Sequence, residues 1–432
     1  MKKLTNAEKL SVRREHSPNA VLYWILMWVI RILNKTVNTS FTYRARPSEE
    51  KGPIVLVSNH ASRMDYLFTA PVCYPKRLNY VVGYNEFYRF PANILLHIAQ
   101  VIPKKNFTPD IHCIRSIHRI VQGGGNICLM PEGMSSITGM SQPVMPGTGK
   151  VLKNLGCPVY YTIVSGGYLT FTKHFTGTRK GRIDVTVDKM FSSEDLAALS
   201  PEQIEDRMNQ LLAHDDYIWN ETAAVEFAGE GRMAEKLDTL LYMCPKCGTM
   251  YDMSCKGNVL SCRHCGNAVE LDAKYRLHPL GSSSVCPARV TDWALMERKR
   301  AAQDVAEEGF RYSEKVRLGV LPDYGSLKGA DCTAVLCGEG ELSLDSSALS
   351  FTGSLKGRKL EFRIPVLSLP TFGMCTDISR FYTFLDGQFL EFYPERNDAL
   401  RWVHLVEEMH RFMGGKWQAC PYRHQDSSIF LK

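Results

Sequence analysis

Short apolar runs alternate with stretches of helical pattern between positions 53 and 189 of the chain. Strands that alternate with helices in this way predict a layered α/β domain. The predicted strands are Ile54–Ser58, Leu78–Gly83, Ile127–Pro131, Val159–Val164 and Ile183–Val187. Ser200-Pro201-Glu202-Gln203 then opens a helix with a capping box and a first-turn proline. We expect this helix to run to about His214 and to close the domain.

Composition limits the class of protein without choosing a function. The chain has 432 residues, of which 44% are hydrophobic and 22% charged, enough to build two or three cores and to exclude a disordered or collagen-like protein. A formal charge of +7 is compatible with binding to anionic lipid or phosphate, but it does not indicate either ligand. Of the 14 cysteines most are scattered, which favours a reducing, cytosolic environment over a disulfide framework.

A histidine and an aspartate follow the first predicted strand, in the string Asn59-His60-Ala61-Ser62-Arg63-Met64-Asp65. Open α/β sheets place their chemistry at strand ends, so this position favours a functional site. Asp65 can fold back onto one ring nitrogen of His60, fix the tautomer and leave the other nitrogen as a general base. By itself the pattern also fits a loop histidine that caps a helix.

A second turn, Pro131-Glu132-Gly133, ends the third predicted strand. The two strings in this order resemble the glycerolipid acyltransferases, over about residues 35–220. Tyr84–Pro91 with Val101–Lys105 resembles the second block of that family, and Gly156–Val159 resembles its fourth block. The resemblance therefore implies an α/β domain of the glycerolipid-acyltransferase type.

The resemblance also implies a reaction. His60 is expected to take the proton from an acceptor hydroxyl as that oxygen attacks an acyl thioester, either acyl-CoA or acyl-carrier protein, while Asp65 orients the ring. The implied acceptor is a lysophospholipid, 1-acylglycerol-3-phosphate first, in phospholipid biosynthesis. Glu132 would bind acceptor hydroxyls, Gly133 would allow close backbone approach, and backbone amides would stabilise the oxyanion. The residues expected to bind substrate are Asn59, Ser62, Glu86, Lys104, Lys105, Glu132 and Gly133.

The chain departs from the family where the acceptor phosphate is usually held. The third block usually continues Thr-Arg-Ser, whereas Met134 and Ser135 stand at the first two of those positions, so the arginine that binds phosphate is missing. The second block usually ends in arginine, and Lys104 and Lys105 offer point charges without bidentate geometry. The acceptor is therefore held differently, or it is another hydroxyl lipid.

Two CxxC pairs, each followed by glycine, lie within residues 240–270. That segment is too short for a hydrophobic core of its own, so a metal must supply its stability. The pattern resembles a zinc ribbon, in which four thiolates close the site and make the zinc structural. Cys255 and His264 are off the pattern and are expected to be bystanders. The predicted ligands are Cys244, Cys247, Cys262 and Cys265.

The rest of the chain is predicted to contain one long helix and a small β module. Residues 287–310 have a helical pattern whose charge run, Glu297–Arg300, is expected to face solvent. From 331 to 413 apolar and polar residues alternate, Asp386-Gly387 marks a hairpin, and Asn397 caps a final helix. We expect a small antiparallel β-barrel plugged by that helix, similar to a pleckstrin-homology module, with Lys356–Lys359 as either a head-group contact or an ordinary solvated turn.

The N-terminal segment contains an apolar run, Ala20–Leu33, behind several basic residues. Ser17 and Pro18 are expected to start a helix there. At 1.5 Å per residue it would be about 21 Å long, shorter than a hydrocarbon core of roughly 30 Å, so it is not expected to span. Trp24 and Trp28 share one face, which favours a monotopic membrane helix; a helix buried against its own domain is the alternative.

The sequence thus predicts an acyltransferase on the cytoplasmic face of a membrane, monotopic or peripheral. Its regions are a basic segment with a membrane helix (1–35), the acyltransferase domain (36–225), the ribbon (240–270), a helical linker (287–310), the β module (331–413) and a tail (414–432). Two alternatives stay open: transfer to a different hydroxyl lipid, and a non-catalytic membrane scaffold that binds a protein partner through the ribbon or the β module. Nucleic-acid binding is not expected, because the ribbon has few aromatic and basic pairs.

Overall fold

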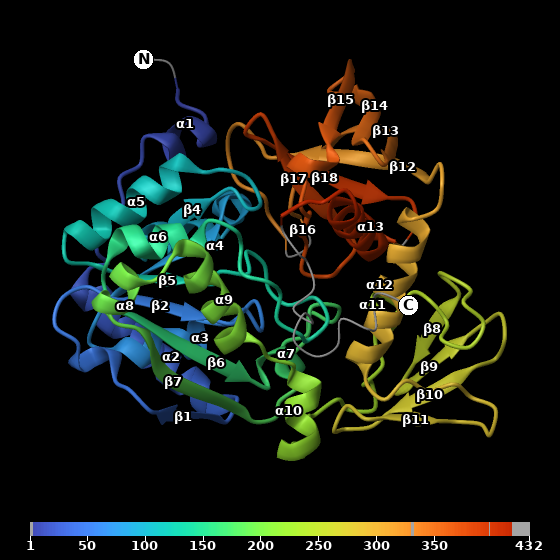
Figure 1. The fold of residues 1–432 in the computed structure, drawn as a ribbon, viewed down its shortest axis with the longest axis horizontal. Coiled ribbons are helices and arrows are strands. Elements are labelled where there is room, and N and C mark those ends of the chain that lie inside the picture. Colours follow the sequence, from blue (N-terminus) through green and yellow to red (C-terminus); the bar gives the residue numbers. More distant parts are fainter. Residues whose placement is uncertain (1–2, 330–331, 397, 417–432) are drawn as a thin grey trace.

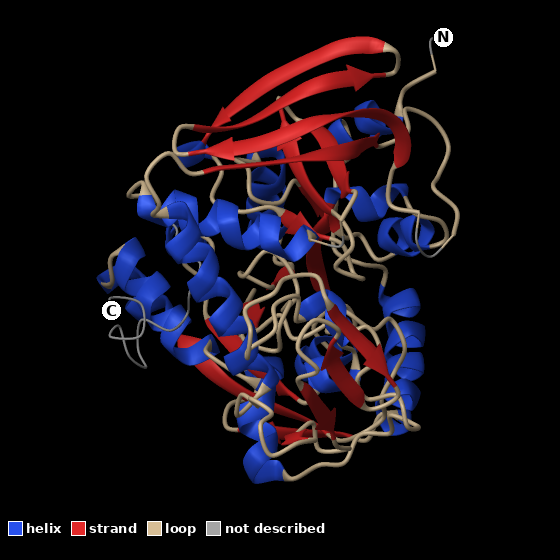
Figure 2. Cartoon of the chain, turned by 90° about the vertical axis from the view of Figure 1, so that its right-hand side faces the viewer, coloured by secondary structure: helices blue, strands red, loops and turns tan. Residues whose placement is uncertain are grey.

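The computed structural model describes residues 3–329, 332–396 and 398–416 (Figure 1). Three sheets follow one another along these residues, with seven, four and seven strands. The first sheet forms an α/β domain, the four-stranded sheet carries the cysteine pairs, and the last sheet lies across one end of the molecule (Figure 2). A mixed α/β architecture was the fold class expected for the first part of the chain, and the structure confirms it.

The first sheet has the strand order β1-β7-β6-β2-β5-β3-β4. Neighbours are parallel except β6 and β7, which are antiparallel. All five strands predicted from the apolar runs are present, and the short edge strands β1 and β4 were not predicted. The bounds are β1 Thr39–Tyr43, β2 Val55–Ser58, β3 Leu78–Gly83, β4 Ile102–Lys104, β5 Asn126–Leu129, β6 Val159–Ser165 and β7 Ile183–Phe191.

Helices cover both faces of this sheet because side chains alternate along its central strands. On β2, Val55 and Val57 pack with α5, α6, α8 and α9, whereas Leu56 packs with α2 and α3 on the other face. Helix α9 begins at Pro201 behind the predicted Ser200 capping box and ends at Leu212. The bounds are α2 Ala20–Thr36, α3 Tyr66–Thr69, α5 Ile111–Gln122, α6 Thr148–Leu155, α8 Ser193–Ala198 and α9 Pro201–Leu212.

Short helices make the connections around the domain. They include α7, which follows β6, and the 3-10 helix η3, which follows β3. The bounds are α1 Asn6–Ser11, η1 Pro47–Glu49, η2 Ala70–Cys73, η3 Tyr84–Tyr88, α4 Ala92–Ile98, α7 Gly167–Thr170, α10 Asp216–Ala223 and α11 Leu237–Leu240.

The four-stranded sheet is antiparallel, in the order β11-β10-β9-β8. It extends beyond the expected segment 240–270, because β11 adds a strand from the following residues. Its inward side chains, among them Leu260, Val269 and Tyr275, join a larger core rather than forming one of their own. The bounds are β8 Met253–Lys256, β9 Val259–Cys262, β10 Ala268–Leu271 and β11 Leu277–Pro279.

The last sheet is antiparallel, in the order β15-β14-β13-β12-β18-β17-β16. Among the described residues the two edge strands, β15 and β16, do not pair with each other, so the strands form an open sheet instead of the closed barrel that was expected. It also starts earlier than residue 331, because β12 supplies its centre. The bounds are β12 Arg311–Val320, β13 Val335–Asp345, β14 Ala348–Leu355, β15 Arg358–Pro365, η4 Val366–Ser368, β16 Gly373–Met374, β17 Phe381–Leu385 and β18 Gln388–Pro394.

The chain continues from this sheet into a final helix that packs on it. The final helix α13, Ala399–Phe412, lies on the sheet, and the predicted hairpin turn at Asp386-Gly387 joins β17 and β18 with both residues at positive φ. Asp398 precedes α13 without a side-chain cap, and Asn397, the predicted cap, lies outside the described residues. Whether the module has a pleckstrin-homology fold remains a prediction.

Helix α12, Val290–Val305, is not the solvated linker that its charge run suggested. Glu297 is fully buried and accepts a hydrogen bond from the Met243 amide at 2.8 Å. Arg298 is 12% exposed and pairs with Glu407 and Glu408 of α13 at 2.6 and 2.8 Å. The expectation failed because the sequence showed the charges of α12 but not the acidic residues of α13 that pack against them.

One hydrophobic core joins the three parts of the molecule. It contains Met134 from the turn after β5, Tyr217 from α10, Tyr275 from the turn between β10 and β11, Trp293 from α12 and Trp402 from α13, all of them buried. The regions predicted as separate modules are therefore packed against one another through a continuous apolar interior.

Helix α2 starts at Ala20 with Asn19 as its N-cap, and not at the predicted Ser17-Pro18. Asn19 Oδ1 accepts from the amides of Val21 and Leu22, which satisfies the first turn. One side of the helix packs on the sheet through Tyr23, while the other remains exposed. Among the described residues no helix combines the length and the apolar character needed to cross a bilayer.

Candidate active site and cysteine cluster

The ends of two neighbouring parallel strands create the candidate active site. β2 ends at Ser58 and β5 at Leu129, and the strands pair in parallel from Val55 with Ile127 to Val57 with Leu129. The turns that follow them therefore leave the sheet at the same edge. The structure brings His60 and Glu132 together there, as predicted from their positions after two strands.

His60 and Asp65 form a hydrogen-bonded pair. His60 Nδ1 lies 2.8 Å from Asp65 Oδ2, and Asp65 Oδ1 accepts from the Ser62 amide at 2.9 Å and from Ser62 Oγ at 2.8 Å. A carboxylate accepts hydrogen bonds, so Nδ1 is the ring nitrogen that donates to Asp65 in this arrangement. Nε2 makes no hydrogen bond to any described residue, and the His60 side chain is 23% exposed beside a 2% exposed Asp65. The ring therefore offers an unprotonated nitrogen to a solvent-accessible site.

Glu132 anchors the backbone of His60. Its Oε1 accepts from the His60 amide and its Oε2 from the Gln142 amide, each at 2.7 Å. The Ser136 amide in turn donates to the His60 carbonyl at 2.7 Å. Complete burial raises the pKa of Glu132 to about 8, although both amide donors favour its ionised form. His60 is thus held on both sides of its peptide by the turn that follows β5.

Four of the residues expected to bind substrate form hydrogen bonds or ion pairs within the protein instead. Glu132 is fully buried with both oxygens occupied, so we assign it to positioning and not to the acceptor hydroxyls. Asn59 bonds the backbone of Val164 on β6 in both directions, at 2.8 and 3.0 Å. Ser62 is buried on Asp65, and Glu86 is paired with Arg89 at 3.0 Å. For Asn59 and Glu132 the sequence strings could not show these supporting roles, because their partners lie on other strands and turns.

The remaining three residues lie at the end of β4 and in the turn after β5. Lys104 ends β4, and Lys105 follows with Nζ 5.3 Å from the centre of the Tyr84 ring. Gly133 has a φ of +81°, and a Cβ there would lie 3.0 Å from a ring carbon of Phe107, so glycine is required in this turn. Their contact with substrate remains a prediction.

The contacts of two further residues, Lys173 and Arg63, were not predicted from the sequence. Lys173 follows α7 and donates from Nζ to Ser135 Oγ at 2.9 Å. Arg63 lies inside the His60 string, but nothing in the string indicates that its guanidinium reaches the backbone of the segment 172–177. Both interactions bridge residues far apart in sequence, so only the tertiary structure reveals them.

The four predicted cysteine ligands come together at one end of the ribbon segment. All four Sγ atoms lie within 4.8 Å of one another. Cys244 Sγ is 3.6 Å from Cys265 Sγ, and Cys247 Sγ is 3.8 Å from Cys262 Sγ. A tetrahedral zinc ion with Zn–S bonds of about 2.3 Å requires sulfur atoms about 3.8 Å apart, so the cluster fits that ion. The four cysteines could therefore hold a metal.

Each cysteine pair is shaped by the glycine that follows it. Gly248 and Gly266 have φ values of +73° and +72°, in the left-handed region that favours glycine. Their amides donate to the carbonyls of Cys244 and Cys262 at 2.9 and 3.0 Å, which turns both thiols of each pair to the same side. Cys255 is outside the cluster, and its Sγ accepts from the Asp238 amide instead.

The family model described as Acyltransferase matches residues 40–165, a span that contains His60, Asp65 and Glu132. The resemblance to an acyltransferase family that the motif strings predicted is therefore supported over residues 40–165.

Among solved structures, the chain is similar to the crystal structure of the 1-acyl-sn-glycerophosphate (LPA) acyltransferase, PlsC, from Thermotoga maritima. The similarity has a TM-score of 0.36 at 14% sequence identity and covers 44% of this chain and 78% of that chain. No curated protein matches the chain.

Proposed function

We propose that the protein transfers a fatty acyl group from an acyl thioester, acyl-CoA or acyl-carrier protein, to the hydroxyl of a lysophospholipid, with 1-acylglycerol-3-phosphate as the leading acceptor. The observation that carries the proposal is the open Nε2 of His60, whose other nitrogen is held by Asp65 at 2.8 Å. The match of residues 40–165 to the acyltransferase family supports the reaction type.

In the proposed reaction His60 Nε2 takes the proton of the acceptor hydroxyl while its oxygen attacks the thioester carbonyl. Asp65, which already accepts three hydrogen bonds, stabilises the imidazolium that forms. Collapse of the tetrahedral intermediate breaks the C–S bond, and the imidazolium returns its proton to the leaving thiolate. The products are an ester and a free thiol, and no acyl-enzyme is needed.

Lipid mass spectrometry of the purified protein tests this function. Wild type, H60A and H278A would be incubated with acyl-CoA or acyl-carrier protein and a panel of phosphorylated and uncharged lysolipids. His278 on β11 is exposed and pairs with Asp272 at 3.0 Å, so H278A removes a matched histidine–aspartate pair without touching the site. A product formed by wild type and H278A but not by H60A is expected; no product from any combination would favour the scaffold alternative.

We propose that the cysteine cluster holds a structural zinc ion. Four thiolates fill a tetrahedral coordination sphere and leave no position for a reacting water. The proposal rests on the Sγ separations and on the shared core, which places the ribbon segment against Tyr217 and Trp293. Elemental analysis of the purified protein is expected to find one zinc per chain, and none in a variant in which Cys262 and Cys265 are replaced by serine.

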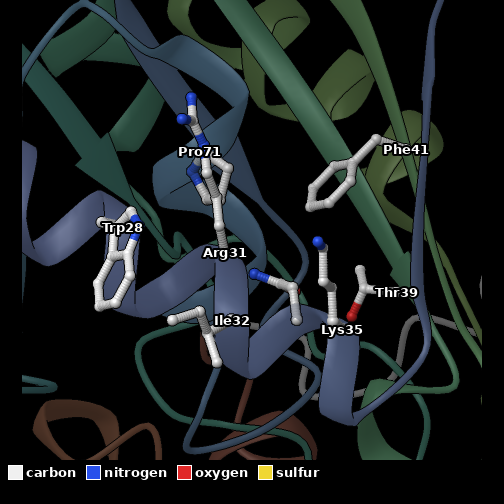
Figure 3. A pocket seen from close by; sticks show the side chains of 8 residues that line it. Trp28, Arg31, Ile32, Lys35, Thr39, Phe41 and Pro71 are labelled. Carbon is white, nitrogen blue, oxygen red and sulfur yellow. The ribbon is translucent and has the colours of Figure 1, made fainter.

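We further propose that α2 lies in the interface of a membrane. Its outward side chains are apolar and exposed, Trp24 at 57% and Trp28 at 60%, whereas Tyr23 packs inward. A hollow of about 360 Å³ beside the helix is lined by Trp28, Ile32 and Phe41 together with Arg31 and Lys35 (Figure 3). Apolar groups next to two cations suit the acyl chains and anionic head groups of a bilayer surface.

A further inference from the structure

Lys173 is a buried cation that forms no ion pair with the described residues. Its residue is 6% exposed, and no carboxylate of the described residues lies within 4.0 Å of Nζ. Nζ donates to the Ser135 carbonyl at 3.3 Å and to Ser135 Oγ at 2.9 Å. An ammonium has three N–H donors, and both of these acceptors belong to one uncharged residue. A buried charge in such surroundings is costly unless an anion joins it.

The residue that Lys173 bonds lies beside the catalytic pair. Ser135 precedes Ser136, whose amide donates to the His60 carbonyl at 2.7 Å. Ser135 also stands where the resembling family carries the arginine of its third block. The ammonium of Lys173 therefore lies against the position from which that guanidinium is missing, although it comes from a segment far along the chain.

Arg63 holds the segment that carries Lys173. Its Nη1 donates to the Thr172 carbonyl at 3.1 Å, and its Nη2 donates to the carbonyls of Thr176 and Gly177 at 2.5 and 3.1 Å. Arg63 lies between His60 and Asp65 in sequence, so one side chain of the histidine turn positions the lysine-bearing segment. We assign Arg63 as a positioning residue, because its donors contact protein carbonyls.

We propose that Lys173 binds a phosphate group of the substrate, in place of the arginine absent from position 135. The inference rests on the proposed acyl transfer and names the residue that recognises its charged substrate. A phosphate could come from the acceptor, as in lysophosphatidic acid, or from the coenzyme A of the donor. Ser136, which follows Ser135, bonds the backbone of His60. Because His60 must reach the acceptor hydroxyl, this connection favours the acceptor.

The surroundings of Lys173 predict a pH dependence. Burial lowers its pKa to about 8; Glu86 of η3 and Cys375 and Asp377 after β16 raise it, and Arg63 lowers it. A phosphate is bound by the ammonium and not by the neutral amine. The KM for a phosphorylated acceptor is therefore expected to be constant below pH 8 and to rise toward tenfold per pH unit above it, while the KM for an uncharged acceptor stays level across that range.

Kinetics of K173M, with K153M as the matched control, test the inference. Lys153 Nζ bonds the carbonyls of Leu196, Ala197 and Leu199, so K153M also removes a lysine that contacts only uncharged oxygens. K173M is expected to raise the KM for lysophosphatidic acid about 10- to 100-fold, with a small change in kcat and no change for monoacylglycerol. K153M should leave both acceptors unaffected. An unchanged KM in K173M would overturn the inference.

Two further variants separate charge from structure. K173R keeps a cation and should stay within a few fold of wild type, and S135R combined with K173M should recover much of the lost affinity by restoring the arginine. A purely structural lysine would predict a lower melting temperature for K173M and no rescue by S135R. A binding lysine predicts an equal or higher melting temperature, because the variant removes an unpaired buried charge.

Changing the donor identifies the source of the phosphate. If the acceptor supplies it, K173M loses affinity equally with acyl-CoA and with acyl-pantetheine, which lacks the phosphates of coenzyme A. If the donor supplies it, the loss disappears with acyl-pantetheine, and the assignment to the acceptor is wrong.

Calorimetry with glycerol 3-phosphate keeps this inference separate from the proposed reaction. Binding to wild type that K173M loses would support the phosphate site even if no acyl transfer occurred. Acyl transfer by wild type that K173M retains at full affinity would support the reaction and reject the site.

Discussion

The histidine–aspartate pair and the cysteine cluster are built in opposite ways. The cysteines are held by two local turns, each closed by an amide donating to the carbonyl four residues earlier, and a single hairpin of β8 and β9 lies between them. His60 has its aspartate nearby in sequence but is fixed by Glu132, Ser136 and, through Asn59, by β6. Local geometry decides one site, and the packing of several elements decides the other.

The strength of the sequence signal follows from this difference. Two CxxC pairs with glycines specify almost all of a four-thiolate site, so the spacing alone predicted four residues that the structure brings within 4.8 Å. The His60 string is common by chance and became informative only together with Glu132. The two regions are nevertheless joined, because Met134 in the active-site turn and Tyr275 in the ribbon segment belong to one core.

Of the changes that test this comparison, removal of the proposed zinc ion should have the largest effect. In small zinc domains metal binding contributes about 10–16 kcal/mol of apparent free energy, so chelation is expected to unfold the ribbon segment. Because the core is shared, the acyltransferase domain should lose stability as well. Differential scanning calorimetry with and without chelator measures this; a domain that melts unchanged in the chelated protein would show that the shared core carries no coupling.

Substitution of His60 should separate chemistry from stability. H60A is expected to lower kcat by about 10²- to 10⁴-fold, because the general base is lost, while the melting temperature changes little. Steady-state kinetics and thermal melts on the same preparation check both parts. Equal losses in H60A and H278A would contradict the assignment of His60 as the base.

Substitution of Glu132 should affect stability and chemistry together. E132Q keeps one acceptor oxygen for two backbone amides, so one buried donor is left unpaired at a cost of about 1–3 kcal/mol. The shifted His60 should also lower kcat. In E205Q, the control, one oxygen already serves the amides of Gly147 and Gly149, so both bonds can remain. Urea denaturation and kinetics of the two variants decide whether Glu132 positions His60.

Substitution of an exposed tryptophan on α2 should have the smallest effect. W24S is expected to weaken binding to vesicles containing anionic phospholipid by about 1–2 kcal/mol, or about five- to thirtyfold, and to leave folding unchanged because Trp24 is 57% exposed. Vesicle sedimentation measures the change. Y66S, which replaces another exposed aromatic outside the helix, serves as the control; equal losses in both would place the contact beyond α2.

Much of the fold could be predicted because it follows local rules. Strand alternation identified five strands of the first sheet, the capping box at Ser200 identified α9, and Asp386-Gly387 identified the β17–β18 turn. The edge strands β1 and β4 were missed because short strands are specified mainly by their neighbours. The charge run of α12 was misjudged for the same reason, since its partners lie on α13.

The sequence by itself determined the chemical groups of this protein. They are the histidine and aspartate after the first predicted strand, the glutamate and glycine after the third, and the four thiols. Spacing within a turn is sufficient for these, because a turn of a few residues has few conformations. Only the tertiary structure decided that Glu132 supports His60 and that Lys173 lies against Ser135. Both contacts join segments that are distant in sequence and meet only when apolar faces are buried. No local sequence pattern shows which distant segments will meet.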